Sequence, residues 1–453
     1  MAIAAFRAVA GERMSARAVH LGVDLGTSRT AAAIAVTAGD AVSVRPVRLG
    51  RAGTAASSSV FAADDGLVHG DQAERLGVAA PERLLRETRR RVGDPVPLVA
   101  AGRALPAAQL YAATVGWVVD AVAAREDAVV DEVTVTVPSA WSAHRLGTVA
   151  DALATAGLPR VTLLSEPLAA AAHARSMGTL PDGAVVAVYD LGETCFEFTL
   201  LRYDGDADPT VIHSAIIGDL GGADFDDLVL QHVRDAAGTA ISGDPSAVSA
   251  LRRACVRAKE DLAASAETEI ALPRSDRSIR LVRSEFEAMV APLLERTVAL
   301  CGEVLREAGL DPEDVAAIVL AGGSSRMPAV AQQLSDAFDR PLLVDPAPHT
   351  VIARGAARAG AAASLRAEAG AGLILGRSGA AETAMAPTPL IDAETEASAA
   401  RGRHGVLDLP ARWRAAMVTT AACALLVGGF AVGGAITAAP PAPFPSPAAP
   451  VAD

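Results

Sequence analysis

Aromatic residues are scarce in this chain of 453 residues and make up only 3% of it. Hydrophobic residues nevertheless reach 51%, so Ala, Val and Leu must fill the core. The length suffices for two or three domains. The four cysteines form no CxxC pair and no metal-ligand spacing, so we expect reduced cytosolic thiols and no metal site built on cysteine.

Lysine is almost missing, because Lys259 is the single lysine among 40 basic residues and the others are arginine. The net charge is −13, and so acidic a chain argues against general nucleic-acid binding, which needs a basic face. In so lysine-poor a chain, the position of Lys259 is informative.

The pattern along the chain predicts one folded α/β region. Residues 1–18 lack a continuous apolar run, and we expect a disordered leader rather than a signal peptide. From 19 to about 365, apolar strand-like runs alternate with Ala/Leu/Arg helical patterns, which is typical of α/β proteins. Residues 366–411 are rich in Ala, Gly, Glu, Thr and Pro without a sustained apolar period, and they predict a flexible linker.

An uncharged run at 415–438 follows the linker. As a helix rising ~1.5 Å per residue it would span ~36 Å, enough for the ~30 Å hydrocarbon core. We therefore predict a transmembrane helix at 412–438, the alternative being a buried soluble helix or a low-complexity tail. Arginines flank its N-terminal side, so the positive-inside rule predicts a single-pass protein of the cell membrane with a cytoplasmic N-terminal domain and an extracytoplasmic Pro-rich tail at 439–453.

Gly429 and Gly433 form a GxxxG motif within the predicted membrane helix. Small residues at this spacing let two helices approach closely, so a homodimer through this face is one expectation.

An Asp-Leu-Gly phrase occurs twice, as VDLGTSR at 23–29 and as YDLGETC at 189–195. Both copies stand between apolar runs, which suggests two copies of one strand–turn–strand unit. Each copy offers an aspartate, Asp24 or Asp190, and a tight turn. Two such hairpins facing each other would hold a metal-bound polyphosphate between them.

The first copy carries groups suited to phosphate and magnesium. Gly26, like Gly192 in the second copy, lets the turn bend tightly and lets backbone N–H groups approach an anion. Thr27 and Ser28 add hydroxyl groups. Asp24 supplies a carboxylate for a magnesium ion, which prefers few carboxylates and several waters.

Two further glycine turns follow. Gly221 and Gly222 stand in GDLGGADFD at 218–226, where they open a helix, and a helix N-terminus suits phosphate oxygens. Gly322 and Gly323 stand in LAGGSSRMP at 320–328, between a strand and a helix, and would let a base or ribose lie against the backbone.

The set of motifs resembles the nucleotide-binding domain of the heat-shock 70-kDa (DnaK-type) chaperone family, within the actin/hexokinase-like ATPase superfamily. The supporting segments are DLGTS at 24–28, VTVTVPSAWSAHR at 133–145, SEPLAAAAHA at 165–174, YDLGETCFEF at 189–198, GDLGGADFDD at 218–227, ACVRAKEDL at 254–262 and AGGSSRMP at 321–328. The resemblance covers about 19–365. It implies a duplicated actin-like fold of two lobes with nucleotide in the central cleft.

The resemblance also implies roles for single residues and the cofactors ATP or ADP and magnesium. Asp24 and Asp190 would face the metal through water, and Glu166 would lie beside the attacking water. The phosphate contacts would be Gly26, Thr27, Ser28, Gly192, Gly221 and Gly222. The residues enclosing the adenosine would be Lys259, Gly322, Gly323, Ser324 and Arg326. The family has a lysine on its adenosine-binding helix, where this chain has its only one.

The chain departs from the family pattern around the phosphates. Arg89 stands where the family has its catalytic lysine, and arginine is bulkier and planar. Glu193, Thr194 and Cys195 replace the Gly-Gly-Thr of the second turn. The glutamate adds a negative charge, and the missing glycines restrict close approach of the backbone.

Three further substitutions lie nearby. Glu197 replaces an aspartate, Val256 replaces a glutamate on the adenosine side, and His349 stands for an aspartate. These changes favour nucleotide binding over fast hydrolysis.

We therefore expect a membrane-tethered, chaperone-like ATP-binding protein whose slow magnesium-dependent hydrolysis opens and closes two lobes. The alternative is a non-hydrolysing nucleotide-binding scaffold that recruits protein partners, which the sequence does not name. A sugar kinase of the same superfamily is a third interpretation, without a dedicated sugar-site motif to favour it. Only a linker, one span and a short tail follow the domain, so we expect no peptide-binding domain.

Overall fold

The first half of the fold is built on a mixed sheet. Its strands are β1 (Ala18–Leu25), β2 (Arg29–Ala38), β3 (Ala41–Val47), β4 (Ala55–Ser57), β10 (Val129–Val137) and β11 (Arg160–Ser165). The order is β11-β10-β1-β2-β3, with β4 paired to β2 off this path. β1 to β3 form an antiparallel meander, whereas β10 and β11 extend the sheet in parallel.

The second half repeats this plan. Its strands are β12 (Val185–Leu191), β13 (Phe196–Arg202), β14 (Thr210–Ile217), β17 (Val315–Ala321) and β18 (Leu342–Leu343). The order is β14-β13-β12-β17-β18, again an antiparallel meander extended by parallel strands. The predicted strand–turn–strand repeat is confirmed, because each Asp-Leu-Gly phrase ends the first strand of its meander. The mixed α/β architecture fits an actin-like ATPase.

The structure is a computed structural model that describes residues 18–373, with gaps at 39–40, 52, 159, 179, 206 and 239–243. The described residues belong to one compact unit. The predicted leader, apart from Ala18, lies outside them, as do the predicted membrane helix, the GxxxG pair and the Pro-rich tail. The last described helix, α9 (Val351–Leu373), continues eight residues into the segment expected to be a linker.

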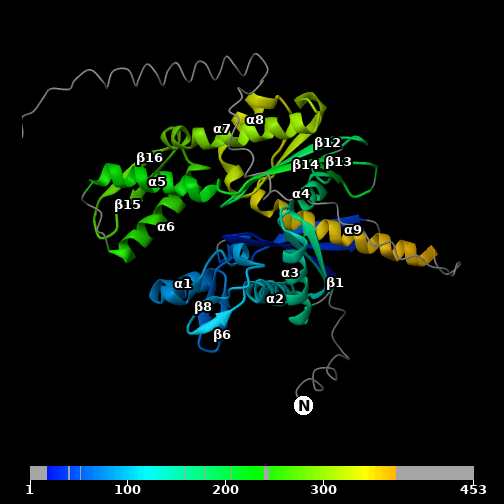
Figure 1. Ribbon diagram of the computed structural model, residues 1–453, viewed down its shortest axis with the longest axis horizontal. Helices are drawn as coiled ribbons and strands as arrows, with labels where there is room; N and C mark the ends of the chain where they lie inside the picture. Colours follow the sequence, from blue (N-terminus) through cyan, green and yellow to red (C-terminus); the bar gives the residue numbers. More distant parts are fainter. Residues whose placement is uncertain are drawn as a thin grey trace, which may run out of the picture. The chain divides into compact units, whose positions relative to one another are not determined.

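Smaller elements are inserted into the first half (Figure 1). They are β5 (Val60–Ala63), β6 (Gly66–His69), α1 (Asp71–Ala79), η1 (Pro81–Arg83), β7 (Leu84–Leu85), η2 (Thr88–Arg91), β8 (Leu98–Ala100), β9 (Arg103–Leu105), α2 (Ala107–Glu126), α3 (Ala143–Thr155) and α4 (Glu166–Ala174). Among the described residues, α2 is long and apolar enough to span a membrane. Half of it is buried within the folded protein, as in ordinary core helices, so its composition is weak evidence for a span.

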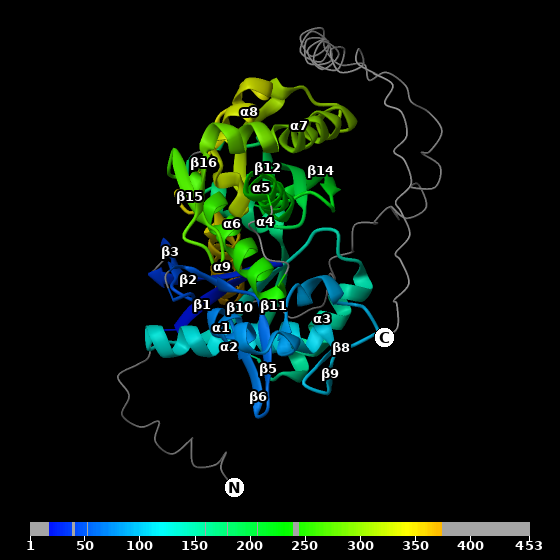
Figure 2. The same ribbon diagram turned by 90° about the vertical axis from the view of Figure 1, so that its left-hand side faces the viewer.

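The second half carries its own insertions, which Figure 2 shows around α5 and α7. They are α5 (Gly222–Ala237), α6 (Pro245–Leu262), β15 (Glu267–Ala271), β16 (Ser278–Val282), α7 (Arg283–Glu307), η4 (Pro312–Asp314), η5 (Gly323–Arg326), α8 (Pro328–Phe338), η6 (Pro348–Thr350) and α9 (Val351–Leu373). β12 is buried along nearly its whole length, as expected of a strand covered on both faces.

Helix α9 packs against both halves (Figure 1). One side meets α4 and the second sheet, with Ala356 buried together with Ala169 of α4 and Val186 of β12. Another side meets the first sheet, where Ala353 and Ala357 join alanines of β2. Backbones can approach this closely only where the side chains between them are small, and alanine meets that need.

A buried polar cluster fixes the start of α9. His173 Nε2 on α4 lies 2.9 Å from Asp345 Oδ2, and Arg354 Nη1 donates to the same oxygen at 2.5 Å. Asp345 also accepts the backbone N–H of Ala347 at 2.8 Å. These contacts tie α4 and α9 to the loop between β18 and η6.

We predict that Gly355→Ala destabilises the protein by about 1–3 kcal/mol, because overpacking displaces well-packed neighbours. A Cβ at Gly355 would lie 1.7 Å from the carbonyl oxygen of Ala169 on α4. Chemical denaturation of the full chain measures the change in the free energy of unfolding.

The matched control is Gly147→Ala in α3, where no described atom lies within 4 Å of the added Cβ. Removing a helical glycine there should stabilise the protein by up to about 1 kcal/mol. If both variants gained stability, the close approach of α9 to α4 would be contradicted.

Candidate functional site

A cavity of about 660 Å³ lies where the glycine turns of the two halves meet. The sequence-predicted residues that line it are Asp24, Gly26, Thr27, Ser28, Arg89, Glu166, Asp190, Gly192, Lys259, Gly322, Gly323, Ser324 and Arg326. Gly221 and Gly222 do not line it. The lining also includes residues that the motifs alone did not place there, among them Arg29, Thr54, Asp71 and Glu260.

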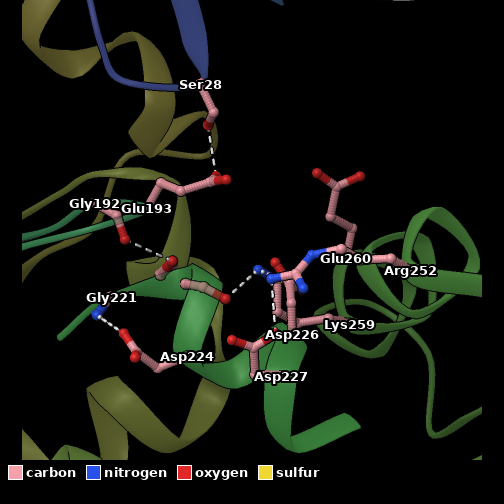
Figure 3. Close-up of polar contacts among 12 residues, drawn as sticks. Ser28, Gly192, Glu193, Gly221, Asp224, Asp226, Asp227, Arg252, Lys259 and Glu260 are labelled. Carbon is pink, nitrogen blue, oxygen red and sulfur yellow. Dashed lines mark hydrogen bonds and ion pairs between the residues drawn. The ribbon is translucent and has the colours of Figure 1, made fainter. Parts of the chain in front are cut away.

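The first turn joins β1 to β2. The backbone N–H of Gly26 donates to the carbonyl of Arg29 at 3.0 Å, and a Cβ at Gly26 would lie 2.7 Å from that oxygen. This close approach explains the glycine. The following hydroxyl groups point to the second turn: Thr194 Oγ1 donates to Thr27 Oγ1 at 3.4 Å, and Ser28 Oγ donates to Glu193 Oε2 at 2.5 Å (Figure 3).

The second turn is held by the third and the fourth. The carbonyl of Gly192 accepts the N–H of Gly222 at 3.0 Å and the hydroxyl of Ser324 at 3.1 Å. A Cβ at Gly221 would lie 2.4 Å from the carbonyl oxygen of Glu193. The Gly221–Gly222 pair therefore supports the backbone of the second turn, and its predicted phosphate contact stays a prediction.

Gly322 in the fourth turn has a left-handed backbone conformation, with φ of 81°. A Cβ there would lie 2.3 Å from the carbonyl oxygen of Leu191 and 2.5 Å from Asp190 Oδ1. Both the conformation and the space require glycine. This turn therefore presses directly against the aspartate of the second hairpin.

Lys259 on α6 reaches the third turn (Figure 3). Its Nζ donates to the carbonyl of Gly222 at 2.8 Å and lies 2.9 Å from Asp226 Oδ1 on α5. Burial raises the pKa of Asp226 to about 6, although the Lys259 charge opposes this rise. The lysine thus links α5 to α6 at the edge of the cavity. The motif at the start of α5 contains Asp226, but it did not identify this aspartate as the partner of Lys259.

Arg89 and Glu166 form a buried ion pair beside the two aspartates. Arg89 Nη1 lies 2.8 Å from Glu166 Oε1 and donates to the carbonyl of Leu25 at 2.9 Å. Burial alone would lower the pKa of Arg89. The negative charges of Glu166 and Asp24 have the larger effect and hold this pKa above its ordinary value. Arg89 is therefore a fixed cation, already engaged by Glu166.

Comparison with known proteins decides the family. The family model described as Hsp70 protein matches residues 94–369. The chain is 34% identical over 376 residues to the chaperone protein HscA of Pectobacterium carotovorum, covering 75% of this chain and 58% of that one. A second relative is the HscA homolog of Azotobacter vinelandii, 36% identical over 226 residues, covering 49% of this chain and 35% of the relative.

The chain belongs to the Hsp70 family. It carries the nucleotide-binding domain of the Hsp70 type, as the motifs indicated. It spans between about a third and three fifths of the length of these relatives. The first Asp-Leu-Gly turn lies before the residues that the family model matches, and the fold brings it to the same cavity as the later turns.

The two aspartates of this Hsp70-type domain lie among like charges. Burial and the nearby Glu166 raise the pKa of Asp24 to about 7, although Arg89 and a 3.0 Å hydrogen bond from Thr136 Oγ1 oppose the rise. Burial and Glu166 likewise hold the pKa of Asp190 well above its ordinary value. A cation between these carboxylates would relieve both effects.

Glu197 is the buried carboxylate that replaces the family aspartate. Its Oε1 accepts hydroxyl hydrogen bonds from Ser139 at 2.5 Å, Thr199 at 3.0 Å and Ser214 at 3.2 Å. Burial raises its pKa, and the hydroxyl groups lower it. Hydroxyl groups on β13, on β14 and in the turn after β10 therefore accommodate the longer side chain. The sequence motifs did not predict this network.

Burial raises the pKa of the nearby Cys195 thiol to about 12, so this thiol is a poor nucleophile.

His349 and Glu260 connect the two halves across the cavity. His349 Nε2 lies 2.8 Å from Thr54 Oγ1, and Arg29 Nη2 lies 3.1 Å from Glu260 Oε1. Burial lowers the pKa of His349, and the nearby Arg326 and Arg29 lower it further. The histidine therefore acts as a neutral hydrogen-bonding group where the family has a carboxylate.

The aspartates suit a hydrated magnesium ion. Within the described ranges no group of three or more His, Cys, Asp or Glu side chains could hold a metal by itself. Magnesium is ordinarily held by one or two carboxylates, several waters and substrate phosphates, and it does not need such a cage. Asp24 and Asp190 offer those two carboxylates on the wall of the cavity.

The shifted pKa of Asp24 predicts a pH dependence of stability. The unfolded chain releases this proton near pH 4 and the folded protein near pH 7, so the folded state holds more protons in between. Its contribution therefore makes the protein less stable as pH rises from about 4 to about 7. We expect Asp24→Asn to be about 2–4 kcal/mol more stable than the native protein at pH 8 without divalent cations.

Chemical denaturation of the full chain between pH 5 and 8 in EDTA measures this difference, which should shrink towards pH 5. Asp151→Asn on the exposed face of α3 is the control and should show no such trend. A pH-independent difference for Asp24→Asn would contradict the assignment.

Proposed function

We propose that the chain binds ATP or ADP with magnesium in this cavity, between two actin-like lobes, and hydrolyses ATP slowly. The observation that carries the proposal is the meeting of three glycine turns, the first, second and fourth, at one cavity that Asp24, Asp190 and Glu166 also line. The membership in the Hsp70 family supports it. Opening and closing of the lobes would follow the state of the nucleotide.

The residues suit phosphoryl transfer to water, which depends on positioning and charge neutralisation. Asp24 and Asp190 would hold the hydrated magnesium ion, which supplies positive charge to the transferring phosphoryl group. Glu166 would orient the attacking water, with Arg89 holding its carboxylate in place. Lys259, Gly322, Gly323, Ser324 and Arg326 would enclose the adenosine.

The same proposal extends to a chaperone-like protein tethered to the membrane. The relatives are chaperone proteins by name, and the uncharged run at 415–438 supports the tether. The domain would then face the cytoplasm. Recovery of the full chain in the soluble fraction of cells, rather than in washed membranes, would contradict the tether.

Titration calorimetry of the full chain tests nucleotide binding. We expect saturable heat with ADP or ATP in magnesium and weaker binding in EDTA, because phosphate must otherwise enter beside Asp24 and Asp190 without a cation. Absence of binding at millimolar nucleotide would refute the proposal.

A second function is a nucleotide-binding scaffold that does not hydrolyse ATP. The observation that favours this function is the environment of Arg89. This arginine replaces the family lysine, and it is already bound to Glu166 and to the carbonyl of Leu25. In such a protein the bound nucleotide would hold the two lobes in the arrangement that recruits a partner, and ATP would not be hydrolysed.

Phosphate release separates the two functions. We expect slow release by the native chain, reduced by on the order of 10- to 100-fold in Asp190→Asn because the metal loses a carboxylate. Calorimetry with the same variant confirms that it still binds nucleotide. Equal release by both proteins at the level of buffer would favour the scaffold.

A further inference from the structure

Glu193 is the residue of the second turn that departs most from the family's glycine. Its backbone is fixed: the carbonyl accepts the N–H of Ala223 at 2.8 Å, and Gly221 packs directly against it. Its side chain is exposed and lines the cavity. Because its backbone is held in place, the Glu193 side chain extends into the cavity from one fixed position on the wall.

From that point the carboxylate reaches the first turn. Glu193 Oε2 accepts the hydroxyl of Ser28 at 2.5 Å, as Figure 3 shows. Thr194, the next residue, donates to Thr27 at 3.4 Å. Ser28 therefore already donates its hydroxyl hydrogen to the second turn, whereas Thr27 accepts a hydrogen bond from that turn and keeps its own hydrogen for another acceptor.

The charge of Glu193 is not neutralised by a neighbour. Among the described residues no ion pair joins it to a basic side chain. Three of the four Lys and Arg residues that line the cavity pair with other carboxylates: Lys259 with Asp226, Arg89 with Glu166 and Arg29 with Glu260. The fourth, Arg326 of the fourth turn, forms no ion pair with Glu193 in the described part of the chain. An anion that approached Ser28 would therefore meet an uncompensated carboxylate.

We propose that Glu193 is a specificity-determining residue that competes with the terminal phosphates of a nucleotide for the Ser28 hydroxyl. A carboxylate and a phosphate are both anionic oxygen acceptors, so they exclude each other from this donor. Nucleotides long enough to reach Ser28 must displace Glu193, whereas a nucleoside or a monophosphate binds without doing so. This inference rests on the nucleotide binding proposed above.

Calorimetry with the full chain in magnesium tests the proposal, using adenosine, AMP, ADP and ATP on the native protein and on Glu193→Gln. Glutamine keeps the size and the acceptor oxygen but removes the charge. We expect ADP and ATP to bind the variant roughly 10- to 100-fold more tightly, as for the loss of one charged hydrogen bond. The affinities for adenosine and AMP should change less than about twofold.

The matched control is Glu269→Gln. Glu269 accepts an equally exposed serine hydrogen bond, from Ser278 Oγ at 3.0 Å, in the β15–β16 hairpin. It does not line the cavity, and its replacement should leave all four affinities unchanged.

The outcomes separate the inference from the proposed function. Equal affinities of the native protein and Glu193→Gln for ADP and ATP overturn the inference and leave nucleotide binding intact. Weaker binding of ADP by the variant in magnesium also overturns it, because Glu193 would then be a cation ligand. If neither protein bound any of the four compounds, the proposed function would fall and the inference with it.

Discussion

The close packing of α9 against both halves is the constraint on which the site depends. Its alanines meet β2 on one side and α4 on the other, and Gly355 lets the helix backbone touch that of Ala169. Because α4 begins at Glu166, this contact also sets where the glutamate stands relative to the two hairpins. Larger side chains along α9 would separate the two sheets and widen the cavity, so the alanines and Gly355 of this helix are part of the architecture.

The second constraint is electrostatic. Asp24, Asp190 and Glu166 share one wall, and Arg89 is the basic residue that the described structure places among them. One guanidinium cannot compensate three carboxylates, so raised pKa values are the response of the protein alone. The same imbalance disfavours a bare polyphosphate and favours one that arrives with a divalent cation. On the proposed function, nucleotide affinity and metal dependence would therefore be set by one group of residues.

The sequence predicted the parts of the site that local chemistry determines. Gly26, Gly322 and the Asp-Leu-Gly hairpins follow from turns that exclude a Cβ, and such turns leave a signal in a few adjacent residues. The pairs Ser28–Glu193 and Lys259–Asp226 left no such signal, because their members are far apart in the chain. The motif also did not reveal that Gly221 and Gly222 support the backbone of the second turn, a contact that exists beside their predicted phosphate role.

The two hairpins share a backbone plan but differ in what they present to the cavity. The first keeps the short hydroxyl side chains of Thr27 and Ser28, which can exchange one oxygen acceptor for another with little change in free energy. The second has exchanged glycine for Glu193, which supplies an acceptor of its own and satisfies Ser28 in the absence of a ligand. A site whose donors are already satisfied gains less from a phosphate than one whose donors are free, because each new hydrogen bond replaces an existing one. On the proposed nucleotide binding, Glu193 would therefore reduce what a terminal phosphate gains at Ser28, and it would do so through a side chain, without altering the backbone plan of the hairpin.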